Sequence, residues 1–249
     1  MRVYYNTLEL GVTLWMFSMI NIKRSKTGID ELDNNLEGGF PKGSITIITG
    51  NSGTGKTILC SQFLVVGAEI NGEKGLYVSL SEGRERYITY MNKVGLNVNE
   101  LEETEKILIL DLLPSKCPGV DTAIQRITEK IIENRIQRLV IDNYSALIQA
   151  LPSTIESRIT LQLLSRVLSS MDCTTLIVIE KPLGLDTIGS GVEEFISDGI
   201  IELGFHYTGD VRSRTMNVLK MKGTRYSKTR FSFIIDEGIK ILNKSEGDK

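Results

Sequence analysis

The chain has 249 residues, a length typical of one α/β domain. Folding at this size buries about 70% of the surface of the unfolded chain, so stability needs no disulfide or structural metal. Its 29 Lys and Arg against 31 Asp and Glu give a net charge of −2, which excludes a polybasic chain that binds nucleic acid through bulk charge, although not one with a local basic patch. Three widely separated cysteines and a single histidine argue against a disulfide framework, a zinc cluster and a Ser-His-Asp triad, and they fit the reducing cytoplasm.

The first 22 residues form an N-terminal extension with an apolar run over residues 12–20, which is too short to span a bilayer. The run lacks a strongly basic flank and an evident cleavage site, so we do not expect a signal peptide. Three interpretations stay open: an added strand or docked arm, a translation start at Met19 that makes residues 1–18 an artefact of start-site choice, and membrane attachment. The first two are favoured, and we expect a cytoplasmic protein with no membrane partner.

From residue 23 onward, segments with the hydrophobic pattern of strands alternate with segments that have helical periodicity. The predicted strands are residues 44–49, 75–80, 107–110, 138–141 and 174–179. The predicted helices are residues 56–70, 85–94, 121–134 and 153–171. Asp121 is the expected N-cap of the third helix, and Ser153 with Glu156 has the spacing of a capping box in the fourth. This order predicts an α/β fold in which a mostly parallel, twisted sheet is flanked by helices.

After Gly199 the pattern changes to short strands separated by turns. The predicted strands are residues 200–207, 215–221, 230–235 and 239–242. We expect them to form an antiparallel extension of the sheet at its C-terminal side. The chain is therefore divided into the extension 1–22, one domain over residues 23–243 and a flexible tail over residues 244–249.

Residues 50–57 read GNSGTGKT and match the phosphate-binding motif GxxxxGK[ST] at every defined position, between a predicted strand and a predicted helix. Glycines allow the loop to turn its N–H groups toward phosphate oxygens, and the N-terminus of the following helix favours the same anion. Lys56 would place a positive charge at the β- and γ-phosphates, and the Thr57 hydroxyl would ligate Mg²⁺. The residues expected at the ATP are Gly50, Asn51, Ser52, Gly53, Thr54, Gly55, Lys56, Thr57 and Ile58.

Carboxylates follow three of the predicted strands, and strand ends of a parallel sheet line the ligand crevice. Asp142 is expected to hold Mg²⁺ opposite the phosphate loop; the alternative is a carboxylate that caps the next helix. Glu82 is the candidate that orients or deprotonates the attacking water. Glu180 would lie further along this edge, where it could sense the γ-phosphate or pair with a neighbour. For both glutamates the alternative is a solvated side chain at a strand end.

Several further segments resemble RecA-superfamily ATPases of the KaiC/RadA branch, in the correct order from about Thr27 to Leu242. These segments are residues 27–33 (TGIDELD), 38–44 (GGFPKGS), 62–64 (QFL), 191–198 (GVEEFISD) and 219–224 (LKMKGT). The last two are specific to KaiC-like domains. The chain is identified by this resemblance as a single-domain KaiC-like ATPase of archaeal type with a RecA-like P-loop fold.

The resemblance implies properties that the residue spacing does not. KaiC-like domains assemble as rings, usually hexamers, with ATP between subunits, so the chain itself is the expected partner. Lys220 and Lys222 lie in the segment that resembles the one reaching the γ-phosphate of a neighbouring subunit, with Arg225 or Tyr226 adding to it. The alternative is a solvated basic hairpin.

The chain also departs from the family pattern. Typical members carry two adjacent glutamates after the second strand, whereas this chain has Ser81 followed by Glu82, so hydrolysis is expected to be slow or absent. Kinase-type members carry a Ser-Thr acceptor pair where this chain has Glu194 and Phe195, so we do not expect autophosphorylation there. With one such domain, we do not expect a two-ring clock protein either.

Three functions remain open: a ring-forming ATPase that acts as a regulatory switch, a DNA-recombination accessory that binds single-stranded DNA or a recombinase, and a pseudo-ATPase scaffold. DNA binding requires a basic groove with aromatic side chains. The candidate stretch contains Tyr207, Arg212, Arg214, Lys220, Lys222, Arg225, Tyr226, Lys228 and Arg230. Lys220 and Lys222 in this stretch are also expected at the subunit interface.

Overall fold

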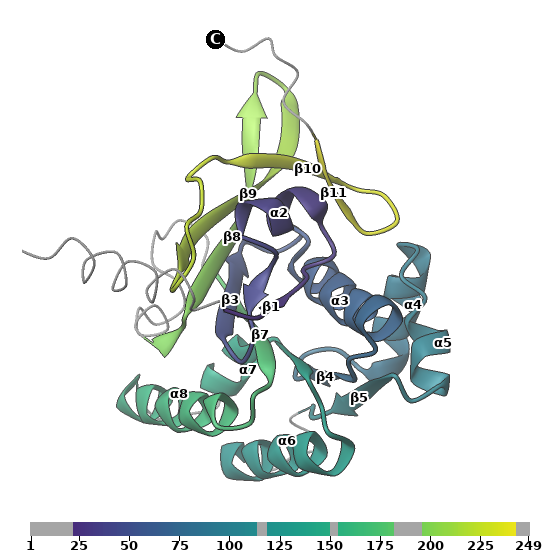
Figure 1. Cartoon of the computed structure of the whole chain (residues 1–249), viewed down its shortest axis with the longest axis vertical. Helices are drawn as coiled ribbons and strands as arrows, with labels where there is room; N and C mark the ends of the chain where they lie inside the picture. Colours follow the sequence, from purple (N-terminus) through teal and green to yellow (C-terminus); the bar gives the residue numbers. More distant parts are fainter. Residues whose placement is uncertain (1–21, 114–118, 150–153, 182–195, 243–249) are drawn as a thin grey trace, which may run out of the picture.

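The chain folds around one nine-stranded sheet with helices on both faces (Figure 1). The computed structural model describes residues 22–113, 119–149, 154–181 and 196–242. In spatial order the strands of the sheet are β11 (Ile239–Leu242), β10 (Phe231–Ile235), β9 (Val211–Met221), β8 (Gly199–Thr208), β3 (Ile45–Gly50), β7 (Thr174–Glu180), β6 (Arg138–Asp142), β4 (Gly75–Ser79) and β5 (Ile107–Asp111). A small second sheet pairs β1 (Arg24–Ser25) with β2 (Phe40–Pro41).

The parallel part of the sheet runs from β8 through β3, β7, β6 and β4 to β5, which confirms the predicted fold class. Every residue of β3, β4 and β6 is buried, as expected for strands covered by helices on both faces. The predicted extension is antiparallel from β8 through β9 and β10 to β11. The first strand of the extension, β8, also pairs in parallel with β3 and so joins the two parts of the sheet.

The helices form two layers, each with its own apolar core. On one face lie α2 (Asp30–Asn35), α3 (Lys56–Val66), α4 (Arg84–Lys93) and α5 (Val98–Glu103), which contribute side chains such as Leu32, Phe63, Tyr87 and Leu101 to the first core. On the other face lie α6 (Val120–Asn134), α7 (Tyr144–Gln149) and α8 (Thr154–Ser169), with side chains such as Ile127, Tyr144 and Leu164 in the second. The strands of the sheet, and the loops at their ends, are therefore fixed between two packed helical layers.

Two predicted helix boundaries need correction. Asp121 does not cap α6: the helix begins at Val120, its N-cap is Gly119 and no side chain caps it, so Asp121 lies in the first turn. The predicted helix 56–70 is α-helical only to Val66 and continues as a π-helical turn, η1 (Gly67–Asn71). The buried side chain of Arg138 lies against Gly67 so closely that a Cβ atom there would overlap it. The absence of a side chain at Gly67 therefore leaves room for this arginine.

Some predictions fall outside the described residues: those on residues 1–21, the cap at Ser153, most of the segment 191–198 and the tail from residue 243. Among the residues that the structure describes, no helix is long and apolar enough to cross a membrane.

Candidate functional site

The phosphate-binding motif forms the loop between β3 and α3, at the edge of the sheet where the parallel strands end. Gly50, Gly53 and Gly55 have φ values of 145°, 78° and 108°, a region that residues with a side chain rarely adopt. A Cβ atom on Gly50 would also collide with the backbone oxygen of Leu203 on the neighbouring strand. The backbone therefore requires glycine at these three positions, as predicted.

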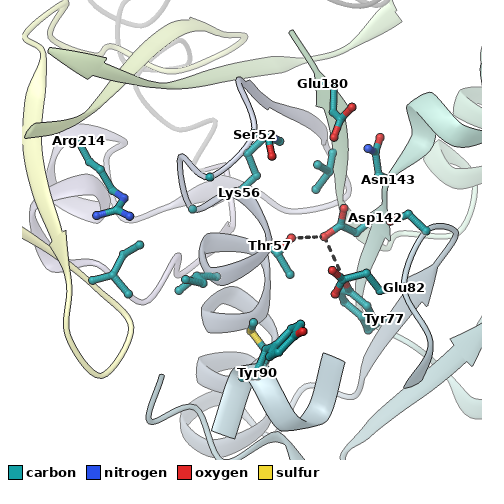
Figure 2. Close-up of a pocket in the computed structure, with 17 residues that line it drawn as sticks. Ser52, Lys56, Thr57, Tyr77, Glu82, Tyr90, Asp142, Asn143, Glu180 and Arg214 are labelled. Carbon is teal, nitrogen blue, oxygen red and sulfur yellow. Dashed lines mark hydrogen bonds between the residues drawn. The ribbon is translucent and has the colours of Figure 1, made fainter. Parts of the chain in front are cut away.

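A cavity of about 370 Å³ opens beside this loop (Figure 2). Six of the nine residues predicted to contact the nucleotide line it, namely Ser52, Gly53, Gly55, Lys56, Thr57 and Ile58. The other three, Gly50, Asn51 and Thr54, make hydrogen bonds that hold the loop in shape. The Thr54 hydroxyl donates to the Asn51 carbonyl at 2.8 Å, and the Asn51 side-chain amide donates to the carbonyl of Lys181 at 3.2 Å.

Lys56 is the first residue of α3, and its side chain turns back to the loop, with the residue only 8% exposed. Nζ donates to the carbonyl oxygens of Gly50 and Asn51, both at 2.9 Å. Burial lowers the pKa of Lys56, and the charges of Glu180 and Asp142 act against that shift. The Lys56 ammonium is thus held beside the N-terminus of α3, where a bound anion would meet both positive groups.

Asp142, at the end of β6, faces the phosphate loop as predicted. Thr57 Oγ1 donates to Asp142 Oδ2 at 2.6 Å, and the hydroxyl of Tyr77 donates to the same oxygen at 3.0 Å. Asp142 is only 6% exposed, and burial raises the pKa of its carboxyl group, while the hydrogen bonds from Thr57 and Tyr77 and the charge of Lys56 act to lower it.

This arrangement of oxygen donors fits Mg²⁺. One carboxylate and one hydroxyl form the hard-oxygen set that magnesium uses when phosphate oxygens and water complete its shell. In the described part of the chain, no group of three or more His, Cys, Asp or Glu side chains could hold a metal ion unaided. A metal at Asp142 would therefore depend on a bound phosphate for its remaining ligands.

The two candidate glutamates reach the same cavity from different strands. Glu82 follows β4, and its turn is held by Ser79, whose hydroxyl donates to the Glu82 carbonyl and accepts from the Glu82 N–H at 3.3 Å. Glu180 ends β7, where its N–H donates to the Ser145 hydroxyl at 3.0 Å. Figure 2 shows Glu82, Asp142 and Glu180 on one side of the phosphate loop. The sheet thus brings together the three carboxylates that the sequence singled out.

The opposite wall was missed by the sequence analysis. Arg214 of β9 and Ile235 of β10 line the cavity together with Tyr90 and Met91 of α4. Arg214, which the sequence analysis named only as part of a candidate DNA-binding stretch, points to this cavity, on the other side of the phosphate loop from Asp142 (Figure 2). The strand register, which puts Arg214 opposite Phe205 and Phe233, determines this direction. No local sequence signal distinguishes it from the neighbouring arginine.

Lys220 and Lys222 lie away from the chain's own phosphate loop. Met221 pairs with Gly199, which pairs with Thr46 near the start of β3, so about 13 Å of strand separates this end from Gly50. Lys220 Nζ donates to the Ser197 carbonyl at 2.8 Å, and Lys222 pairs with Asp198 at 3.1 Å.

Arg225 and Tyr226, which follow the segment 219–224, were expected to add to the contact made by the two lysines. The hydroxyl of Tyr226 donates to the Leu219 carbonyl at 3.0 Å, and Arg225 is exposed. Lys220 and Lys222 thus lie near the start of β3, whereas the phosphate loop follows its end.

Comparisons with known proteins agree with this site. Residues 25–246 match the family model described as "ATPase: KaiC". A UPF0273 protein of Thermotoga maritima is 35% identical over 246 residues, which cover 91% of this chain and 98% of that protein. The circadian clock protein KaiC of Synechococcus elongatus is 33% identical over 231 residues, or 89% of this chain and 44% of KaiC. The chain spans less than half the length of the KaiC relatives it matches.

A solved structure shows the same fold. The crystal structure of a KaiC-like protein from the hyperthermophilic archaeon Pyrococcus horikoshii superposes with a TM-score of 0.81 and 33% sequence identity. The match covers 89% of this chain and 99% of that one.

Proposed function

The chain belongs to the KaiC family of ATPases, and we propose that it binds ATP with Mg²⁺ at the cavity beside the phosphate loop, hydrolyses it slowly and acts as a nucleotide-dependent regulatory switch. Membership of the family supports an ATP-binding, RecA-like domain, which we place at residues 23–243. We propose further that copies of the chain assemble as a ring, up to a hexamer, with ATP between subunits.

The observation that carries ATP binding is the phosphate loop itself, with its three glycines at positive φ and Lys56 at its centre. Loop N–H groups and the N-terminus of α3 would cradle the phosphates, and the Lys56 ammonium would neutralise charge on the β- and γ-phosphates. The wall formed by Ile235, Met91 and Tyr90 offers apolar surface for the base, and Arg214 offers hydrogen-bond donors beside it.

Thr57 and Asp142 would hold Mg²⁺, with Asp142 acting directly or through a metal-bound water. Bound Mg²⁺ supplies positive charge where negative charge develops on the transferred phosphoryl group. Glu82 lines the cavity and would orient the attacking water or take its proton. Ser81 stands where typical family members have the first of two adjacent glutamates and has no comparable basicity, so we propose slow turnover.

ATP binding is tested by Lys56→Ala. A ligand that binds only the folded protein raises its unfolding free energy, by about 2.7 kcal/mol when it is present at one hundred times its dissociation constant. We expect ATP with Mg²⁺ to raise the melting temperature of the parental protein and to have little effect on Lys56→Ala. Lys56→Ala also removes two hydrogen bonds within the loop, so the ATP-induced rise of each protein is measured from its own melting temperature without nucleotide. An equal rise in both proteins would contradict the assignment of the loop.

A DNA-binding role is less well supported than a switch. Of the seven cations in the candidate stretch, Arg214 lines the nucleotide cavity and two lysines make contacts within the chain. At the β8–β9 hairpin, the Arg212 guanidinium lies 4.3 Å from the centre of the Phe205 ring, so a cation and an aromatic ring do come together there. An ATPase measurement with and without single-stranded DNA separates the two functions, because only the DNA accessory should respond.

A further inference from the structure

Two stacked tyrosines lie behind the carboxylate of Asp142. Tyr77 of β4 and Tyr87 of α4 have ring centroids 3.7 Å apart with an angle of 12° between the ring planes, and both side chains are buried. A buried hydroxyl destabilises a protein unless it is hydrogen-bonded, so the partner of each tyrosine is informative. The two partners lie on different elements and have different chemistry.

The Tyr87 hydroxyl contacts α3, not the metal site. It forms a hydrogen bond of 2.9 Å with the hydroxyl of Ser61, one helical turn after Thr57. Ser61 in turn donates to the Thr57 carbonyl at 2.7 Å. The hydrogen bond of the Tyr87 hydroxyl thus ends on Ser61, whereas Tyr87 meets Tyr77 through the stacked rings, which a phenylalanine would preserve.

The Tyr77 hydroxyl contacts Asp142. Its hydrogen bond ends on Oδ2, the oxygen that also accepts from Thr57, so two donors fix the rotation of this carboxylate. Among the described residues, no hydrogen bond is recorded for Oδ1, which keeps its lone pairs for another ligand. Oδ2 therefore accepts the two hydrogen bonds, and Oδ1 is left to accept another ligand.

We propose that Tyr77 is a positioning residue for magnesium: its hydroxyl orients the Asp142 carboxylate so that Oδ1 is presented to the metal or to its bound water. This inference rests on the proposed function, because it concerns the metal of the same site. Hydrogen bonds from the surrounding shell to a metal ligand commonly change metal affinity tenfold or more, which is the effect required here. A phenylalanine would fill the same stack, so the hydroxyl is needed for the carboxylate and not for packing.

The test measures Mn²⁺ binding by electron paramagnetic resonance on the full chain in the presence of a non-hydrolysable ATP analogue. We expect Tyr77→Phe to weaken Mn²⁺ binding about tenfold, following the effect typical of such outer partners. The matched control is Tyr87→Phe, which makes the same chemical change in the other ring of the stack and should leave Mn²⁺ affinity at the parental value. Affinity for a fluorescent ATP analogue in EDTA should be equal in all three proteins.

Three results would overturn the inference. Parental Mn²⁺ affinity in Tyr77→Phe would show that the hydroxyl is not needed, and equal weakening in both variants would assign the effect to the stack. Loss of analogue binding in EDTA would show that the variant damages the phosphate loop. If the parental protein binds nucleotide with no metal dependence, the proposed function fails as well, whereas an intact metal dependence in Tyr77→Phe contradicts this inference alone.

Discussion

Glu82 is the residue on which the enzymatic part of the proposal depends. It reaches the cavity from the turn after β4, and Ser81 beside it lines the same cavity without a carboxylate. We expect Glu82→Gln to retain ATP binding, because the shape of the side chain is kept, and to lose turnover by a factor on the order of 10²–10⁴, because the base is lost. Release of phosphate and ATP-dependent melting measure the two effects separately.

Ser81→Glu provides the complementary experiment, since it restores the first of the two adjacent glutamates in the family pattern. Turnover should increase if the missing glutamate limits the rate. A Glu82→Gln protein that hydrolyses ATP at the parental rate would remove Glu82 from the mechanism, and a parental protein with no turnover would favour the scaffold function.

Arg138 is the second informative residue, at the opposite end of β6 from Asp142. Its side chain is 0% exposed, and Nε lies 2.6 Å from Glu73 while Nη1 donates to the carbonyls of Lys26 and Phe63 at 2.8 and 2.6 Å. Glu73 also accepts from Lys42 at 2.5 Å. A buried ion pair is not in itself strongly stabilising, but removing one partner leaves the other charged and unpaired.

We therefore expect Glu73→Gln to lower the free energy of unfolding by about 3–5 kcal/mol. Urea unfolding measures this change. Glu133→Gln is the matched control, because Glu133 pairs with Lys130 at 3.0 Å on the exposed surface of α6 and such pairs contribute at most about 1 kcal/mol. Equal losses in the two variants would contradict the view that burial makes Arg138 dependent on Glu73.

The same pair predicts a pH dependence. Burial acts to raise the pKa of Glu73, but the hydrogen bonds and charges of Lys42 and Arg138 outweigh it, and the pKa of Glu73 is lowered. A carboxyl group with a lowered folded pKa stabilises the protein above its unfolded pKa, about 4.3, and this contribution is lost as pH falls through the folded pKa. The difference in unfolding free energy between the parental protein and Glu73→Gln should be constant near pH 6–7 and shrink below about pH 4. A difference that grows toward acid pH would contradict the sign.

At the scale of elements, the sequence predicts best where the pattern is long and local. The buried parallel strands and the helices α3, α4, α6 and α8 were predicted, because continuous apolar runs and helical periodicity need no knowledge of their neighbours. The helices α2, α5 and α7 were missed, since six residues are too few to show a helical period. The π-helical turn was missed because the apolar pattern of residues 56–70 does not distinguish it from a continuous α-helix.

The candidate site divides in the same way. The phosphate loop is a contiguous motif, and the three carboxylates could be predicted because strand ends of a parallel sheet meet at one edge. Arg214 and Tyr77 could not, because their roles depend on which strand lies next to which and on the register between them. Tyr77 pairs with Val140, two residues before Asp142, and only the folded sheet makes that neighbourhood visible.

At the scale of the whole molecule, the position of Lys220 and Lys222 decides what kind of assembly the proposal needs. They lie at the C-terminal end of β9, next to the start of β8 and near the start of β3. The phosphate loop follows the end of β3. Because one chain cannot bring both parts to the same nucleotide, the proposed contact with the γ-phosphate requires a second copy. ATP held between two copies would stabilise the oligomer relative to the monomer.

We therefore expect size-exclusion chromatography with light scattering to show a larger species with ATP and Mg²⁺, up to the hexamer that we propose, than without nucleotide. Replacing both Lys220 and Lys222 with alanine should weaken this shift and reduce hydrolysis, because a positive charge beside the transferred phosphoryl group is lost. Each monomer should still bind ATP through Lys56. The control replaces Lys106 and Lys130, two lysines near the β5 edge of the sheet, and should assemble like the parental protein.

The same double substitution also tests the DNA-binding alternative. If Lys220 and Lys222 contact DNA phosphates instead of a neighbour's nucleotide, the variant should assemble normally with ATP. Its affinity for single-stranded DNA should then fall equally for all sequences, and the slope of log affinity against log salt should decrease by up to about two for two lost phosphate contacts. A parental protein that stays monomeric at every ATP concentration while hydrolysing ATP at its full rate would contradict a site between subunits, because the monomer would then be catalytically complete.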